Sequence, residues 1–274
     1  MLVDSHCHLS YDEFAKFIAS RGVAAEDEFY SVKSILDRAK EKDVKYVVNI
    51  GTCISEFEKL KKISDEFQEV FMAVGIHPDN THAHLTAFSE KEMHEVFHKY
   101  CTLPKTVAIG EIGLDFHINH NIEEQKKLFN IQLEYAEEFN LPISIHSRNA
   151  EDEIVSVLRK HPNIRGVIHC FSGESEFTEQ ILQMQSYYFG IGGTLTFKNN
   201  KTLQAALQII PLERILLETD APFLAPTPFR GKINEPSFII KIVEKIAEIK
   251  NISIAEVADT TTNNFFNLFR KAKT

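Results

Sequence analysis

Short apolar runs alternate along the chain with longer segments in which apolar residues recur at helical spacing. Most of the short runs are apolar throughout rather than at every second position, which is typical of parallel strands buried on both faces. The eight runs are Leu2–His8, Tyr46–Gly51, Phe71–His77, Thr106–Leu114, Pro142–His146, Gly166–Phe171, Tyr188–Gly193 and Ile215–Asp220. The pattern therefore predicts eight β-strands spread along the chain.

The segments between the runs have the spacing of amphipathic helices. Val32, Ile35, Leu36 and Ala39 lie at i, i+3, i+4 and i+7, and so would share one helical face. Strands that alternate with helices in this way predict an α/β protein, a TIM-like (β/α)8 barrel that forms a single domain over residues 1–274. A doubly wound open sheet is the alternative, but no glycine-rich phosphate-binding loop follows the first run.

Composition narrows the class of protein. An apolar fraction of 43% is enough for a sizeable core, and no run approaches the roughly 20 apolar residues of a membrane span. We expect no membrane association, no signal peptide and, because the four cysteines form no CxxC pair, reduced thiols in a cytoplasmic protein. The net charge of -9 argues against a protein that coats nucleic acid, but it allows an enzyme with a small positive site. Nothing in the sequence indicates an obligate protein partner.

Metal-binding side chains recur at the predicted C-terminal ends of the strands, where barrel enzymes hold their active sites. They are His6, His8, Glu111, His146, His169 and Asp220. Because residues i and i+2 of a strand face the same side, His6 and His8 would both point into the barrel mouth and Cys7 would point outward. Four histidines and two carboxylates are too many ligands for one tetrahedral site. They suit two ions that share a bridging carboxylate.

Other polar residues near the same strand ends are candidates for contact with a substrate. Arg148 follows the fifth strand, and its guanidinium would match phosphate oxygens bidentately. His77 ends the third strand, where it either contacts substrate or packs beside Pro78. Arg230 and Lys232, in the loop after the eighth strand, either hold a nucleic-acid backbone or are solvated loop charges.

The sequence "HEVFH", from His94 to His98, matches the HExxH pattern of zinc proteases. Met93 and Phe97 already belong to the predicted buried stripe of this helix, which would lie on the outer ring of the barrel. We therefore predict that this match is accidental.

Segments along nearly the whole chain together resemble the TatD family of metal-dependent deoxyribonucleases, within the wider amidohydrolase-like barrels. The segments are "DSHCHL", "GIHP", "AIGEIGLD", "EEQ", "LPISIHSR", "HCFSG", "GIGGTLTF", "PLERILLETDAPFLAP" and "RGKINEP". The resemblance implies a TIM-like barrel with a binuclear divalent metal site. By motif position, His6, His8 and Asp220 would hold the first ion, Glu111 would bridge, and His146 with His169 would hold the second.

Two segments depart from the family pattern. The Arg-Asp pair that usually follows strand five is Arg148-Asn149 here, so no role of that Asp carries over to this chain. The segment Ser10–Tyr30 is longer than usual and contains an acidic run. It would either overhang the site or form a packed surface excursion.

The expected function is hydrolysis of phosphodiester bonds in DNA, as an exonuclease, by a metal-activated water that Asp220 orients and deprotonates. Imidazole ligands favour zinc or manganese, whereas the family resemblance also allows magnesium. One rival is another metal-dependent hydrolase of amides, esters or phosphoesters. Many of those bridge their metals with a carboxylated lysine, where this chain has Glu111. The other is a non-catalytic nucleic-acid-binding or adaptor protein.

Overall fold

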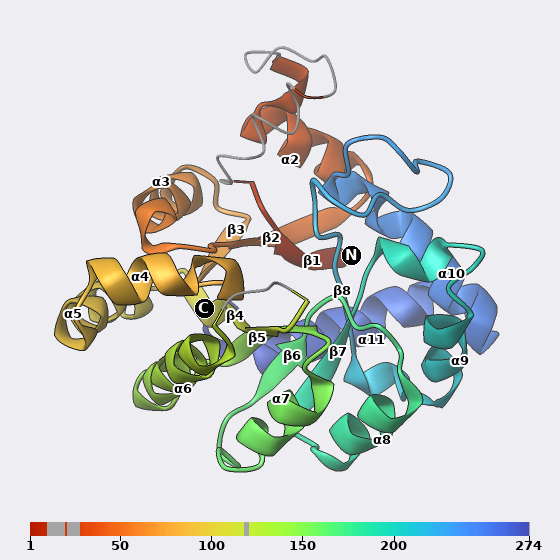
Figure 1. Ribbon diagram of the computed structural model, residues 1–274. Coiled ribbons are helices and arrows are strands. Elements are labelled where there is room, and N and C mark those ends of the chain that lie inside the picture. Colours follow the sequence, from red (N-terminus) through yellow and green to blue (C-terminus); the bar gives the residue numbers. More distant parts are fainter. Residues whose placement is uncertain (10–19, 21–27, 118–120, 274) are drawn as a thin grey trace.

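A computed structural model describes residues 1–9, 20, 28–117 and 121–273 of the chain (Figure 1). Most of Ser10–Tyr30, the segment expected to overhang the site, lies outside the described residues. Eight parallel strands form one sheet in the order of the sequence. They are β1 (Leu2–Cys7), β2 (Val44–Ile50), β3 (Val70–Val74), β4 (Thr106–Asp115), β5 (Ile143–Arg148), β6 (Gly166–Ile168), β7 (Tyr187–Ile191) and β8 (Ile215–Leu217).

The first and last strands complete the ring through the residues that follow each of them. The amide of His8 donates to the carbonyl of Ala221 at 2.8 Å, and the amide of Asp220 donates to the carbonyl of His6 at 2.9 Å. Cys7 and Ala221 form a parallel bridge between them. The predicted barrel is confirmed, and these bonds bring the two ends of the sheet together beside His6 and His8.

Helices surround the strands (Figure 1). They are α2 (Val32–Glu41), α3 (Phe57–Glu66), α4 (Thr81–Ala87), α5 (Glu90–Cys101), α6 (Ile122–Glu138), α7 (Glu151–Leu158), α8 (Ser175–Gln183), α9 (Lys201–Ile209), α10 (Ile239–Lys250) and α11 (Ile254–Leu268). The apolar stripe expected on the first of them is buried at Ile35, Leu36 and Ala39. None of the helices in the described ranges is long and apolar enough to cross a membrane.

The apolar interior has two parts. The larger lies between the strands and the ring of helices, and Cys7 belongs to it, as the alternation along β1 predicts. The smaller fills the barrel itself, where Val3, Val48 and Ala108 pack against Phe265 and Phe269 at the end of α11. Because apolar side chains and the end of α11 fill the N-terminal half of the barrel, the polar side chains gather at the other end.

Several predicted strands run past the ends of the observed ones, and three of them do so by three residues. The sequence predicts strands as far as His77, Phe171 and Asp220, whereas β3 ends at Val74, β6 at Ile168 and β8 at Leu217. His77 caps the short 3-10 helix Pro78–Asn80 instead of ending a strand. Cys170 and Asp220 have φ angles of 46° and 57°. This left-handed conformation cannot continue a strand. His169 and Asp220 therefore lie in turns just beyond the strands, where their side chains converge on the barrel axis instead of alternating along a sheet.

Candidate metal centre

His6, in β1, and His8, one residue past its end, converge with Asp220. The Nε2 atoms of His6 and His8 lie 3.2 Å apart, and Oδ1 of Asp220 lies 3.4 Å from Nε2 of His8. The same oxygen is 3.9 Å from Nε2 of His6. These three donor atoms, which come from opposite ends of the sequence, face one point because the turn after β8 is hydrogen-bonded to β1.

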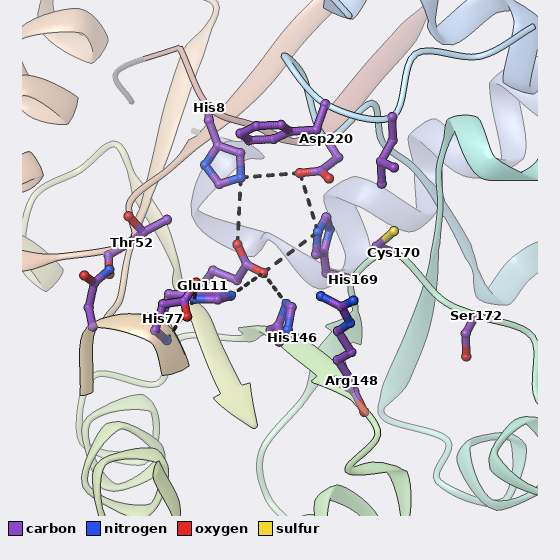
Figure 2. Close-up of a pocket in the computed structure, with 15 residues that line it drawn as sticks. His8, Thr52, His77, Glu111, His146, Arg148, His169, Cys170, Ser172 and Asp220 are labelled. Atoms are coloured by element: carbon purple, nitrogen blue, oxygen red, sulfur yellow. Dashed lines mark hydrogen bonds and ion pairs between the residues drawn. The ribbon is translucent and has the colours of Figure 1, made fainter. Parts of the chain in front are cut away.

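The two carboxylate oxygens of Glu111, on β4, face different groups of histidines (Figure 2). Oε2 lies 3.5 Å from Nε2 of His6 and 3.8 Å from Nε2 of His8. Oε1 lies 2.9 Å from Nδ1 of His146, 3.7 Å from Nε2 of His77 and 3.9 Å from Nε2 of His169. The carboxylate thus stands between the His6–His8 pair and a second cluster, the arrangement expected of a bridging ligand.

The electrostatics of the cluster follow from burial and from close pairing. Burial lowers the pKa of His6 to about 4. Burial would also lower the pKa of His169, but the carboxylates of Glu218 and Glu111 outweigh it and raise that pKa to about 10. Burial would raise the pKa of Glu111, but the neighbouring His77 and His169 hold it well below its usual value. Burial would likewise raise the pKa of Asp220, but His8 and His169 hold it below its usual value, so Glu111 and Asp220 both stay ionised.

The donor set fits a divalent metal ion. Two nitrogen ligands on one tetrahedral zinc ion, each at about 2.0–2.1 Å, are separated by about 3.3 Å. The Nε2 atoms of His6 and His8 lie 3.2 Å apart, which matches that spacing. Imidazole nitrogens and ionised carboxylate oxygens in one buried cluster are the usual ligands of such ions. Without an ion, a proton on His169 balances part of the carboxylate charge, and a bound ion would displace that proton.

A second set of buried residues holds these side chains in place. Oε1 of Glu218 lies 3.1 Å from Nδ1 of His169 and accepts a hydrogen bond from the amide of Cys170 at 2.6 Å. Oδ2 of Asp115 lies 3.0 Å from Nε2 of His146. Carboxylates that orient metal-binding histidines in this way fix the ring and raise its basicity.

The loop that carries Asp220 is fixed by two polar side chains. Asp4, expected to support the histidines, accepts hydrogen bonds from the amides of His6 and Thr219 at 3.2 and 2.9 Å, and so supports the site through the backbone. The side-chain Nδ2 of Asn234 donates to the carbonyls of Thr219 and Phe223 at 2.7 and 2.6 Å. Asn234 lies in the "INEP" segment, for which the sequence suggested no role.

Sequence reasoning missed Asp115 and Glu218 as members of the site. Both were visible in the motifs, because Asp115 ends "GEIGLD" and Glu218 begins "ETD". Their signal was weak, since a carboxylate two or four residues from a ligand points toward the site only if the local backbone allows it. The sequence suggested that His77 contacts substrate or packs beside Pro78. In the structure its Nε2 lies 3.7 Å from Oε1 of Glu111, so His77 borders the ligand cluster itself.

The cluster lies at the bottom of a cavity of about 730 Å³. Arg148 lines this cavity, and Figure 2 shows its guanidinium directed toward the histidines. Asn149 faces a neighbouring cleft instead, together with Glu151. The cavity is of the size that holds small ligands, about 300–1,000 Å³.

Three residues singled out in the sequence lie outside the cluster. Arg230 and Lys232 are exposed in the loop after β8, outside the cavity lining. His94, from "HEVFH", lies on the outer surface of α5, where Nε2 is 2.9 Å from Glu138 of α6. Among the described residues, no group of three potential ligands includes His94 or His98. The position of His94 on the outer surface agrees with the interpretation of this match as accidental, which stays a prediction.

Comparison with known proteins places this arrangement in a family. The family described as TatD related DNase matches residues 3–270. The chain belongs to the TatD family. It is 35% identical to the uncharacterized metal-dependent hydrolase YabD of Bacillus subtilis, over 98% of this chain and 99% of that one. It is 31% identical to the uncharacterized metal-dependent hydrolase YcfH of Escherichia coli K12, over 98% and 95%.

A solved TatD structure has the same fold. The TatD homolog YJJV of Escherichia coli K12 superposes with a TM-score of 0.85 at 28% identity, over 98% of each chain. The family and these relatives make this TatD protein a metal-dependent hydrolase. The resemblance seen in the sequence motifs is confirmed, and the convergent cluster is where a hydrolase of this kind would hold its metal.

Proposed function

We propose that this protein is a deoxyribonuclease that hydrolyses phosphodiester bonds at DNA ends with two divalent ions. The observation that carries the proposal is the split carboxylate of Glu111, whose oxygens face separate groups of histidines. Paired ions suit the in-line displacement at phosphorus, because they clamp both the attacking and the leaving oxygen. The description of the matching family as DNase supports this choice of substrate.

The two groups of ligands divide around Glu111. His6, His8 and Asp220 would hold the first ion, and His146 with His169 would hold the second. His77 would complete the second group, since its Nε2 faces the same oxygen of Glu111. Imidazole-rich ligands favour zinc or manganese, and the carboxylates also allow magnesium. When bound, the ions lower the pKa of a coordinated water and offset the charge of the phosphate.

Asp220 and Arg148 supply the remaining chemistry. Oδ1 of Asp220 lies at the centre of the cluster, within 3.4–3.9 Å of His8, His169 and His6, where it can accept the proton of an attacking water. The guanidinium of Arg148 enters the cavity from β5 and can bind two oxygens of the scissile phosphate. A cavity of about 730 Å³ suits a few nucleotides at a strand end rather than a duplex interior.

The test is an activity assay on protein loaded in turn with zinc, manganese or magnesium. Single- and double-stranded DNA are assayed beside a panel of small amides, carboxyl esters and phosphotriesters, with chelated samples as blanks. Glu111→Gln and Asp220→Asn should reduce DNA cleavage by at least about 10³-fold, because each variant removes a metal-holding carboxylate and Asp220→Asn also removes the proton acceptor. His94→Gln is the matched control, because it removes an exposed imidazole far from the cluster and should cleave DNA as the wild type does.

Each other outcome selects another function. Cleavage of amides or carboxyl esters without cleavage of DNA would replace the nuclease proposal by a different hydrolase on the same barrel. Binding of DNA without cleavage under any metal would favour an adaptor that retains the fold. Full activity in both the Glu111 and the Asp220 variants would overturn the assignment of the cluster as the catalytic centre.

A further inference from the structure

The loops after β7 and β8 carry exposed cations beside the metal-centre cavity. Lys198 follows β7, and Arg230 and Lys232 lie in the long loop between β8 and α10. All three side chains are exposed, and none of them forms an ion pair with a carboxylate in the part of the chain that the structure describes. In a chain with a net charge of -9, unpaired cations gathered on one rim produce a locally positive surface.

The guanidinium of Arg230 stacks on an aromatic ring. Its guanidinium carbon lies 3.7 Å from the ring centroid of Phe197, in a cation–π contact between the two loops. One face of the guanidinium covers the ring, so the opposite face and the edge are free of Phe197. The free face of a stacked guanidinium can receive a nucleobase, and its edge can donate to phosphate oxygens.

These residues border a hollow that is separate from the metal-centre cavity. The hollow is lined by Thr194, Phe197, Lys198, Asn199, Asn200, Thr227 and Arg230. Its lining combines cations, amides and one aromatic ring, and it contains no carboxylate. That composition suits a polyanion with flat bases better than it suits a neutral or a cationic ligand.

The hollow and the cavity are neighbours along the loop after β8. Leu224 lines the metal-centre cavity and is 40% exposed, and Thr227, three residues later, lines the hollow. The amide of Thr227 donates to Oγ1 of Thr196 at 2.8 Å, which ties the two loops together. Gly193 permits this approach, since a Cβ there would lie 2.1 Å from the carbonyl oxygen of Leu224. A ligand that extends from the cavity past Leu224 would reach the hollow.

We propose that Phe197, Lys198 and Arg230, here called the rim site, bind the DNA strand that leaves the metal-centre cavity. The proposal rests on the proposed nuclease function, and it adds a second contact beyond Arg148. A base of the leaving strand stacks on the guanidinium of Arg230, and Lys198 contacts the adjacent phosphate. The rim site therefore strengthens binding of long substrates and leaves the chemistry at the metal centre unchanged.

The test compares a dinucleotide with a single-stranded oligodeoxythymidine of about 12 nucleotides, within the range that stacking surfaces cover. Arg230→Gln should raise KM for the oligonucleotide about tenfold, the loss expected for one stacked base, and leave kcat and dinucleotide cleavage unchanged. The same variant should lower the slope of log KM against log salt by about 1. Arg230→Lys keeps the charge but not the planar face, and should recover the salt slope while KM stays raised.

The matched control is Arg159→Gln. Arg159 is exposed at the C-terminal end of α7, which faces the opposite end of the barrel because the helices run antiparallel to the strands. Arg159→Gln removes one positive charge from the chain, as Arg230→Gln does, but it does so far from the rim site. It should therefore leave KM and the salt slope at wild-type values. A KM change equal to that of Arg230→Gln would assign the effect to net charge and overturn the rim site.

Binding to the Glu111→Gln protein separates this proposal from the nuclease proposal. Fluorescence anisotropy of the labelled oligonucleotide should show about tenfold weaker binding when Arg230→Gln is added. If the wild type cleaves no DNA but this loss of binding is seen, the nuclease function fails and the rim site stands. If DNA is cleaved and neither KM nor binding responds to Arg230→Gln, the rim site fails and the nuclease function stands.

Discussion

Glu218 and Gly190 allow a precise test of how the metal centre is positioned. The carboxylate of Glu218 is fully buried and contacts both the ring of His169 and the amide of Cys170. Gly190, on β7, leaves the space for it, because a Cβ at this position would lie 2.3 Å from Oε2 and 2.8 Å from Cδ of Glu218. Gly190→Ala would therefore displace the carboxylate without touching any proposed ligand.

The size of the effect follows from these contacts. Removing a carboxylate that orients a metal-binding histidine typically costs 10–100-fold in metal affinity or activity. Glu218→Gln keeps the volume and an acceptor for the amide of Cys170, so we expect about a tenfold loss, whereas Glu218→Ala should approach about 100-fold. Gly190→Ala adds overpacking, which costs about 1–3 kcal/mol of stability. It should weaken metal binding as Glu218→Ala does, because the added methyl group displaces the carboxylate from its contact with His169.

The assay is calorimetric titration of the metal-free protein with zinc or manganese, with urea unfolding measured in parallel. Gly192→Ala is the matched control, because a Cβ there would meet Glu218 only at 3.7 Å or beyond, which is ordinary contact. It should bind metal as the wild type does. Wild-type metal affinity in Gly190→Ala and Glu218→Ala would refute the positioning role. If these variants lose stability but not metal affinity, Glu218 contributes only to the stability of the fold.

Three further predictions concern the metal, the "HEVFH" segment and the apolar core. Saturating metal at about 100 times its Kd stabilises the folded state by about 2.7 kcal/mol, so chelation should lower Tm by about 5–10 °C for a chain of this size; scanning calorimetry with and without chelator checks this, and an unchanged Tm would argue against a metal site. His94→Gln should keep the metal content of the wild type in elemental analysis, because His94 pairs with Glu138 on the outer surface; lost metal would show that "HEVFH" binds it. Phe97→Ala should lower the free energy of unfolding, measured in urea, by about 3–5 kcal/mol, because the ring is fully buried and its centroid lies 5.5 Å from that of Phe57. A loss below about 1 kcal/mol would contradict this packing.

The order and direction of the strands could be predicted from the sequence by itself. Continuous apolar runs separated by amphipathic segments leave few arrangements other than a barrel of parallel strands, because each run needs cover on both faces. The same reasoning placed the ligand-type side chains at one end, since all strands of such a barrel point the same way. His6 and His8 needed only the two-residue period of a strand to share one face.

Tertiary structure decided which polar groups meet and at what distance. The alternation along a strand carries no information about turns such as those at Cys170 and Asp220, whose left-handed backbone aims His169 and Asp220 at the barrel axis. The contact of Glu218 with His169 depends on space left by Gly190 on a neighbouring strand, and the stacking of Arg230 on Phe197 depends on two loops approaching through Gly193. Such contacts join residues far apart in the sequence, so the local patterns that predict strands and helices cannot specify them.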